Sequence, residues 1–248
     1  MNDQKTEALV IRLADFSNTS RVVTFFTRDF GKVSTIAKGG KRLTGPFESA
    51  LDLLADCGIV FLRKSSSALD ILTEARLINR FRPNPDSLES FYAGCYVSEL
   101  LAGLTEDYDP HPVLFETARW TLAEFSREVD YRLPLLRFEL VLLRENGQLP
   151  SFDLCVHCGS PIEVGGRFSF WVTQGGLLCS SCQTQESTTH QIQAGTVAIL
   201  RRLAEASESA ASRMSASPQQ LREMRYTMTE AISAILGRRP KSLSFLKP

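Results

Sequence analysis

Short apolar runs separated by turn residues dominate the first 80 or so residues of the chain. Apolar and β-branched side chains alternate with polar ones in five runs, which predict strands at residues 8–13, 21–27, 32–37, 58–63 and 70–73. Asp29-Phe30-Gly31 supplies a tight turn between the second and third runs. Five short strands in about 80 residues favour a small closed barrel, because closure removes the edge strands that promote aggregation.

The pattern changes at Arg82-Pro83-Asn84-Pro85, where two prolines end the β alternation. Beyond this point apolar residues recur at helical spacing, with capping residues at Asp86 and Ser217 and a closing Gly237. The spacing predicts helices at residues 88–104, 113–125, 135–145 and 218–236, and a frayed helix end with a linker at residues 205–217. We therefore divide the chain into a barrel domain at residues 1–82 and a helical domain at residues 83–248.

Four of the six cysteines form two Cys-x-x-Cys pairs, with 20 residues between the pairs. The pairs are Cys155 with Cys158 and Cys179 with Cys182. Each pair can turn back on itself so that all four sulfurs surround one Zn²⁺ at ~2.3 Å. A strand-like run at residues 167–172 lies between the pairs, as in a zinc ribbon. The spacing predicts a zinc-ribbon-like module at about residues 150–187, inserted in the helical domain.

The metal is expected to be structural, because a catalytic zinc keeps one coordination position open to water. Two disulfides or two redox pairs are the rival interpretation. Neither is favoured, since nothing indicates export and the β-α-β setting of a thioredoxin-like pair is missing. Cys57 and Cys95 lie in apolar stretches and are predicted to be small core residues.

The sequence contains no catalytic motif, so no catalytic residue is assigned. Lys38-Gly39-Gly40-Lys41-Arg42 is no P-loop, because Thr35 stands where the leading glycine would be. None of the three histidines, His111, His157 and His190, stands in the His-x-Glu pattern of a zinc deaminase. The chain is predicted not to be an enzyme.

The charges balance overall, with 28 Lys and Arg against 28 Asp and Glu, but they are unevenly distributed. Residues 1–82 carry 13 basic against 9 acidic residues, residues 83–154 carry 5 against 13, and residues 155–248 carry 10 against 6. A basic barrel can bind a phosphate backbone while bases stack on aromatics such as Phe26 or Phe30. The alternative is a solvated loop whose lysines serve solubility. The candidate DNA-binding residues are Lys32, Lys38, Lys41, Arg42, Arg63 and Lys64.

No run approaches the ~18 consecutive apolar residues of a membrane helix. The charged N-terminus is not followed by the apolar segment of an export signal. We expect a protein without membrane contact that is located in the cytoplasm, associated with the nucleoid.

Two stretches resemble a known family. Residues 21–32 followed by 37–42, and residues 137–150 leading into the first cysteine pair and later Gly175-Gly176-Leu177-Leu178-Cys179, are similar to the RecO family of bacterial recombination mediators. The resemblance implies an α+β protein in which an N-terminal OB-fold β-barrel is followed by an α-helical domain with an inserted zinc module. The barrel cations match the family's DNA-contacting strand and loop, and the four cysteines match its zinc ligands.

The resemblance also implies a function. It implies binding to single- and double-stranded DNA, annealing of complementary strands, and partnership with RecR and single-stranded-DNA-binding protein so that RecA is loaded at gaps. One departure is Ser17-Asn18-Thr19-Ser20, where relatives commonly carry an acidic pair before the second strand. A competing hypothesis is a zinc-containing protein-interaction adaptor in which the barrel is incidental, and a third is a zinc hydrolase or deaminase.

Overall fold

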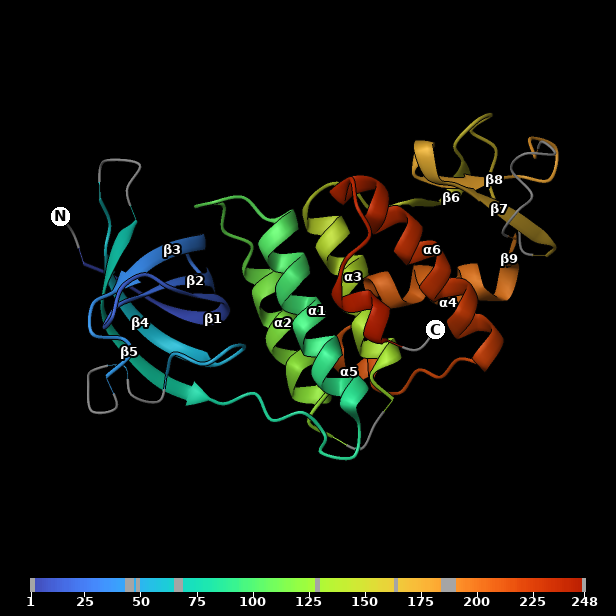
Figure 1. Cartoon of the computed structure of the whole chain (residues 1–248). Coiled ribbons are helices and arrows are strands. Elements are labelled where there is room, and N and C mark those ends of the chain that lie inside the picture. The colour runs from blue at the N-terminus through green and yellow to red at the C-terminus, as the bar shows by residue number, and fades with distance from the viewer. Residues whose placement is uncertain are drawn as a thin grey trace. The chain divides into compact units, whose positions relative to one another are not determined.

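The computed structural model describes residues 3–42, 47, 50–64, 69–127, 130–162, 165–183 and 191–246. It divides into two compact units, Met1–Val129 and Asp130–Pro248 (Figure 1). The predicted α+β fold is confirmed: a five-stranded barrel comes first, helices follow, and a second small sheet is inserted between them. The expected division at residue 82 stays a prediction, as do the limits of the zinc module.

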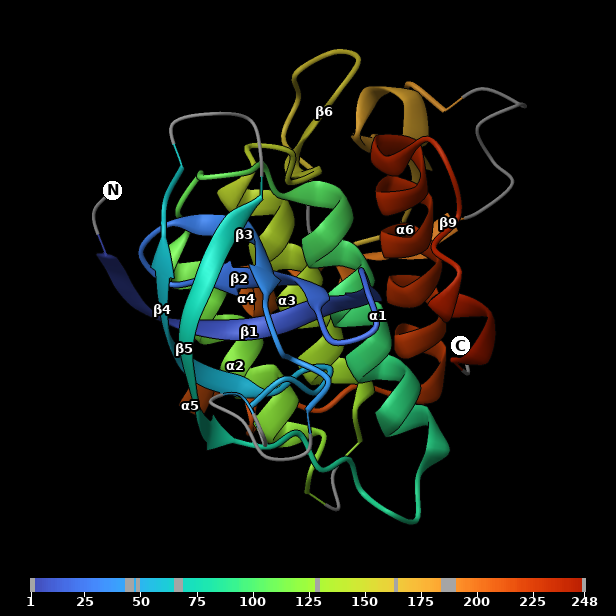
Figure 2. The same cartoon turned by 60° about the vertical axis from the view of Figure 1, so that its left-hand side comes forward.

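The five strands close into a barrel with the order β1-β2-β3-β5-β4. Neighbouring strands are antiparallel except β3 and β5, which pair in parallel over two residues. Figure 2 shows this barrel with β4 and β5 toward the viewer. The strands are β1 (Asp3–Asp15), β2 (Arg21–Thr27), β3 (Gly31–Ala37), β4 (Asp56–Leu62) and β5 (Asp70–Asn79).

Alternation along the strands explains the barrel interior. In β3, Val33, Thr35 and Ala37 are buried, whereas Ser34 and Ile36 between them are partly exposed. The inward residues join those of the other strands in one apolar core. Cys57 belongs to this core as predicted, and burial raises the pKa of its thiol to about 12. Cys95 is only partly buried.

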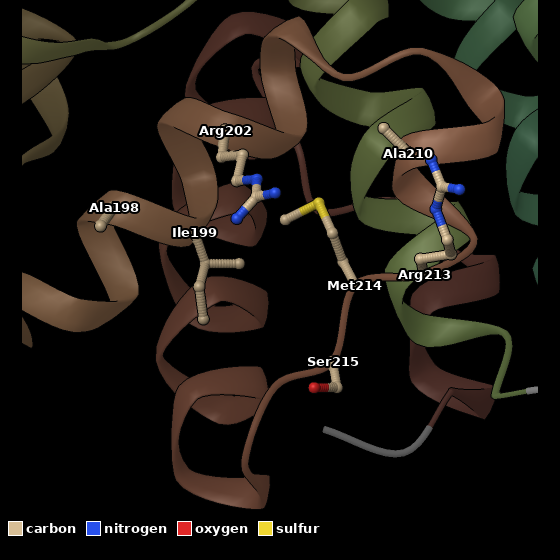
Figure 3. A pocket seen from close by; sticks show the side chains of 7 residues that line it. All are labelled: Ala198, Ile199, Arg202, Ala210, Arg213, Met214 and Ser215. Carbon is tan, nitrogen blue, oxygen red and sulfur yellow. The ribbon is translucent and has the colours of Figure 1, made fainter.

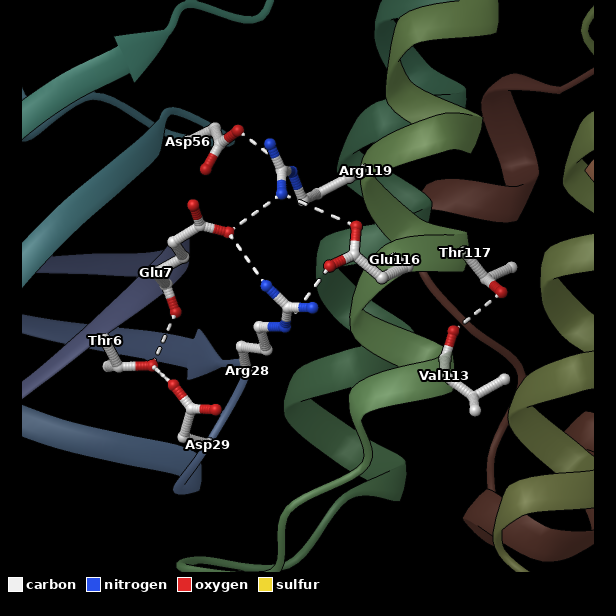
Figure 4. Close-up of polar contacts among 9 residues, drawn as sticks. All are labelled: Thr6, Glu7, Arg28, Asp29, Asp56, Val113, Glu116, Thr117 and Arg119. Carbon is white, nitrogen blue, oxygen red and sulfur yellow. Dashed lines mark hydrogen bonds and ion pairs between the residues drawn. The ribbon is translucent and has the colours of Figure 1, made fainter.

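Two helices complete the first unit, α1 (Leu88–Leu104) and α2 (Pro112–Glu124), both within two residues of prediction. Helix α1 contacts the barrel where the hydroxyl of Ser98 donates to the carbonyl of Ile11 at 2.6 Å. Between α2 and the barrel, Arg119 contacts the carboxylates of Asp56, Glu7 and Glu116 at 2.9–3.5 Å (Figure 4). An ion-pair network therefore joins α2 to β1 and β4 within this unit.

The segment between α1 and α2 pairs with the start of β3, where β5 makes no pairs. Lys32 bridges to Asp107, and the backbone amide of Tyr108 donates to the carbonyl of Lys32 at 3.0 Å. Gly31 lies so close to this segment that a Cβ atom there would come within 2.1 Å of the Asp109 carbonyl oxygen. Its φ of +65° also favours glycine.

The second unit contains helices and a four-stranded sheet with the order β6-β8-β7-β9. Helix α6 begins and ends where the sequence predicts, with a capping box formed by Ser217 and Gln220 and with Gly237 at its end. Ala194–Glu205 forms a helix that the sequence analysis did not predict. The helices are α3 (Arg132–Glu145), α4 (Ala194–Glu205), α5 (Glu208–Ala211) and α6 (Pro218–Leu236). The strands are β6 (Ser151–Cys155), β7 (Arg167–Trp171), β8 (Gly176–Leu178) and β9 (Gln191–Gln193).

The small sheet extends past the predicted module. Strand β9 lies beyond residue 187 and pairs with β7 in antiparallel register. Residues 184–190 lie outside the described residues, and His190 is among them. None of the helices in the described part of the chain combines the length and the apolar character that a membrane crossing needs.

Candidate nucleic-acid interface and metal centre

One end of the barrel brings two chain segments together. Arg21 pairs with Ala37, so the start of β2 lies beside the end of β3. The backbone amide of Lys41 donates to the carbonyl of Thr19, so the β1–β2 loop contacts the turn after β3. We call this region the loop end of the barrel. The β4–β5 loop leaves the barrel in the opposite direction, because β3 is parallel to β5 and β4 is antiparallel to β5. OB-folds bind oligonucleotides on the face of strands 2 and 3, beside the loops that join strands 1–2 and strands 4–5.

Lys38 and Arg42 at the loop end, and Lys64 at the start of the β4–β5 loop, have no ion-pair partner among the described residues. Lys38 and Arg42 are exposed, and Lys64 is half-buried. Their side chains contact no carboxylate among the described residues, and residues 43–46 and 65–68 next to them are not described. These three cations are the strongest candidates for phosphate contacts.

Lys41 at the loop end and Arg63 at the start of the β4–β5 loop already have partners. The guanidinium carbon of Arg63 lies 4.0 Å from the centre of the Tyr108 ring, a cation–π contact that leaves the guanidinium exposed. The ammonium of Lys41 lies 2.9 Å from a carboxylate oxygen of Asp15. Hydrogen bonding to Lys41 holds the pKa of the Asp15 carboxyl below its usual value. Lys41 therefore also fixes the turn after β3.

Lys32 is placed differently from the other five candidates. Its ammonium donates to the carbonyls of Thr105 at 2.6 Å and Ala102 at 3.2 Å, and lies 3.5 Å from Asp107. These carbonyls belong to the C-terminal end of α1, where a cation is stabilised by the helix dipole. The structure gives Lys32 a helix-capping role, and we leave it out of the proposed contact surface.

Of the two aromatic residues expected to stack on bases, Phe26 is not accessible. Phe26 is completely buried, and its ring centre lies 6.3 Å from that of Phe115 on α2. Phe30 is half-buried, with its ring edge-on to Phe61 at 5.6 Å between centres. This expectation was wrong for Phe26, because α2 covers the strand face that the sequence pattern left open. Phe16 in the β1–β2 loop, which the sequence pattern did not single out, is 61% exposed.

The four paired cysteines come together at one point of the second unit. Their sulfur atoms all lie within 4.8 Å of one another, and those of Cys158 and Cys179 are 3.7 Å apart. A tetrahedron with bonds of ~2.3 Å has edges of ~3.8 Å, whereas a disulfide bond is ~2.05 Å long. All four cysteines are free thiols here. The rival interpretation of two disulfides does not fit this structure, and the cluster fits one metal ion.

Local contacts prepare the cluster for a cation. The backbone amide of Cys179 points to the sulfur of Cys155 at 3.4 Å. Contacts with Ser160 lower the pKa of Cys158 to about 6, while hydrogen bonds to Cys158 and Cys179 raise that of Cys182 to about 12. Several thiolates this close repel one another unless a cation lies between them.

Arg201 on α4 attaches this cluster to the helices of the second unit. Its guanidinium donates to the carbonyl of Phe152 and to that of Ile162 at 3.3 Å, and pairs with Asp153 at 2.8 Å. These acceptors lie on both sides of the first cysteine pair. Arg201 therefore positions the chain that carries Cys155 and Cys158.

A separate cavity of about 380 Å³ lies in the second unit, between α4 and the chain around α5. In Figure 3 the side chain of Met214 is seen between those of Arg202 and Arg213. Neither arginine side chain has an ion pair among the described residues. The lining residues are Ala198, Ile199, Arg202, Ala210, Arg213, Met214 and Ser215. Two cations beside apolar walls suit a ligand with a negative charge and an apolar part.

Comparison with known proteins identifies the family. Residues 1–81 match the family model described as "Recombination protein O N terminal", and residues 85–244 match "Recombination protein O C terminal". A protein from Rhodopirellula baltica is 34% identical over 96% of this chain and 97% of its own length. One from Syntrophus aciditrophicus is 32% identical over 98% and 94%, and one from Anaeromyxobacter dehalogenans is 31% identical over 99% and 96%. All three are named "DNA repair protein RecO". The chain belongs to the RecO family, whose members are DNA repair and recombination proteins.

Proposed function

We propose that the chain is a non-enzymatic recombination mediator that binds the backbone of single- and double-stranded DNA at the loop end of its barrel. The observation that supports this most is that Lys38 and Arg42 at that end, and Lys64 on the β4–β5 loop, have no acidic partner among the described residues. Point charges on loops beside an OB-fold sheet suit phosphates and read no base sequence.

Charge also supports this proposal. Each phosphate that a cation neutralises releases condensed counterions, so the affinity falls as salt rises. Contacts of this kind are weak enough for two DNA strands to slide along each other until their complementary bases are aligned. This is the property that annealing of complementary strands needs, and we propose annealing as the activity of the barrel.

The test is binding to a fluorescent single-stranded oligonucleotide, measured by anisotropy at several salt concentrations. The variant Lys38→Ala/Arg42→Ala/Lys64→Ala should bind at least about 10-fold more weakly. The slope of log affinity against log salt should become about 2 units less steep, since each lost phosphate contact removes ~0.7.

A charge-matched control is available on the same barrel. The variant Arg76→Ala/Arg80→Ala/Arg82→Ala removes three exposed cations near and after the end of β5, none of which belongs to the β1–β2 loop, the turn after β3 or the β4–β5 loop. It should keep the slope and affinity of the wild type. Equal loss in both variants would show that net charge alone matters, and unchanged binding in the first variant would contradict the proposed surface.

We further propose that the cysteine cluster holds one structural Zn²⁺. The edge length of the sulfur tetrahedron and the all-cysteine ligand set support it. When bound, the ion joins the two cysteine pairs, and it carries no open position for catalysis. Metal analysis of the purified protein should give one zinc per chain, and replacing Cys155 and Cys179 by Ser should remove it.

Membership of the RecO family supports partners beyond DNA. We propose that the protein acts with RecR and with single-stranded-DNA-binding protein to load RecA at gaps, in the cytoplasm and close to the nucleoid. The test is RecA assembly on DNA coated with single-stranded-DNA-binding protein, with RecR present or absent. The adaptor alternative predicts that the Lys38→Ala/Arg42→Ala/Lys64→Ala variant loads RecA as well as the wild type.

A further inference from the structure

Phe16 is a large apolar side chain that projects from the loop end of the barrel. It follows β1 directly and is 61% exposed, although exposing a phenyl ring to water is unfavourable. No aromatic contact with Phe16 is found among the described residues. Single exposed apolar side chains are common on protein surfaces, so the position of Phe16 beside the cations, and not its exposure alone, points to a role.

Hydrogen bonds fix the loop that carries Phe16. The backbone amides of Phe16 and Ser17 both donate to the carbonyl of Ser20, at 3.1 and 3.2 Å. The amide of Ser20 donates back to the hydroxyl of Ser17 at 3.2 Å. The amide of Lys41 donates to the carbonyl of Thr19 at 3.1 Å, which joins the loop to the cationic turn after β3. The ring is thus held out beside the cations by a defined backbone.

The charge around Phe16 also favours a polyanion. Asp15, the acidic residue next to it, is paired with Lys41 at 2.9 Å and with Arg21 at 3.6 Å. Its carboxylate is therefore compensated. Beyond this pair, Lys38 and Arg42 on the adjoining turn have no described acidic partner. A nucleic-acid backbone that follows these cations brings its bases past the ring.

We propose that Phe16 is the platform on which the barrel stacks an unpaired base, and that it gives the loop end its preference for single strands over duplex. This inference rests on the proposed DNA-binding function and names the residue that sets its specificity. Bases stack on aromatic side chains without regard to sequence, because every base has a π-face. In a duplex both faces of each internal base are already covered by its neighbours, so only unpaired bases can use the ring.

The experiment compares Phe16→Ala and Phe16→Trp with the wild type. Anisotropy titrations use a labelled single-stranded oligonucleotide and a blunt duplex of the same length, each at several salt concentrations. Phe16→Ala should bind the single strand about 10-fold more weakly and the duplex within twofold of the wild type. The salt slope should not change, because stacking releases no counterions.

Phe16→Trp keeps an aromatic platform and adds a signal. It should restore single-strand affinity, and its fluorescence should be quenched by the single strand more than by the duplex. The wild type, which contains Trp120 and Trp171, provides the background titration. Phe245→Ala is the matched control, since Phe245 is a phenyl ring of similar exposure, 55%, in the other unit. It should leave both affinities unchanged.

The outcomes separate this inference from the function it rests on. If the wild type binds DNA with the expected salt slope and Phe16→Ala binds single strands equally well, the stacking role is wrong and the proposed function stands. Equal weakening for single strand and duplex also overturns it, as does unchanged DNA binding with loss of a protein partner. If the wild type binds no DNA at low salt, the proposed function itself fails.

Discussion

At the residue scale, Arg119 shows how a partly buried cation offsets the cost of buried carboxylates. Asp56 is only 6% exposed, and burial raises the pKa of its carboxyl above the usual value while Arg119 at 3.1 Å opposes that rise. Arg119→Ala removes the opposing charge, so the folded-state pKa of Asp56 should rise further. The expected loss is about 2–3 kcal/mol in the free energy of unfolding near pH 8.

The pH dependence of this loss has a defined sign. A carboxyl whose folded-state pKa lies above its unfolded value destabilises the fold while ionised, and this cost disappears as the pH falls through the folded pKa. The effect of Arg119→Ala should therefore be smaller at pH 5 than at pH 8 in urea unfolding. Arg80→Ala breaks an exposed pair with Asp52 and is the control, with under about 1 kcal/mol at either pH. An equal loss at both pH values would exclude Asp56 as the cause.

Gly31 gives a second prediction at this scale. Gly31→Ala combines an unfavourable φ of +65° with a Cβ atom 2.1 Å from the Asp109 carbonyl oxygen, so backbone must move. Gly39→Ala has a similar φ of +79° but meets only the Arg42 side chain at 3.6 Å. We expect about 1 kcal/mol for Gly39→Ala from backbone strain alone and at least about 3 kcal/mol for Gly31→Ala. Equal melting temperatures for the two variants would contradict the packing of this segment on β3.

At the scale of elements, the sequence was informative where structure is local. Helix α6 could be predicted to the residue, because its capping box, apolar stripe and closing glycine all lie within it. Helix α4 could not, because Gln193 makes no side-chain cap and Gly195 weakens the first turn. Its last carbonyls are satisfied from another helix: Arg144 donates to Ala204 at 2.6 Å, and Arg137 to Ala206 at 3.1 Å. A local sequence pattern cannot predict such a cap, because its donors lie about 60 to 70 residues away in the sequence.

The candidate sites also differ in how far they could be predicted. The cysteine cluster could be predicted because the spacing of metal ligands is visible in the sequence. Whether a lysine or arginine is free to contact a phosphate is not visible there, because it depends on residues far away in the sequence. Nothing in the sequence distinguishes Lys32 from Lys38 as a candidate for a phosphate contact. The structure shows that the end of α1 places two carbonyls beside the ammonium of Lys32. One feature of the sequence could have pointed to Phe16: it is an aromatic residue followed directly by the polar stretch Ser17-Asn18-Thr19-Ser20.

Arg201 gives a prediction for the metal-bearing element. Arg201→Ala removes the hydrogen bonds that hold both sides of the first cysteine pair, so the metal site becomes less preorganised. Metal affinity should fall about 10-fold, as for other supporting residues of metal sites. Competition with a coloured chelator measures it. Arg202→Ala, its neighbour without an ion pair among the described residues, is the matched control and should retain wild-type affinity.

At the scale of the whole molecule, the division into two compact units predicts that metal and DNA binding are separable. The cysteine cluster lies in the second unit and the loop end in the first. Each unit buries apolar side chains of its own. A structural zinc contributes on the order of 10 kcal/mol to the element it organises. Removing it should unfold the β6-β8-β7-β9 sheet, which contains Trp171, without opening the barrel.

The measurement combines both readouts on one metal-free preparation. Chelation should abolish the near-ultraviolet signal that depends on Trp171 and make the segment around the cysteines sensitive to protease, while anisotropy with a single-stranded oligonucleotide stays within about twofold. Adding one equivalent of Zn²⁺ should restore the first two properties. The double variant Cys155→Ser/Cys179→Ser should behave like the chelated protein and not respond to zinc. Loss of DNA binding on chelation would mean that the second unit contributes to the nucleic-acid surface, and a metal-free protein that keeps its folded sheet would show that the ion is not structural.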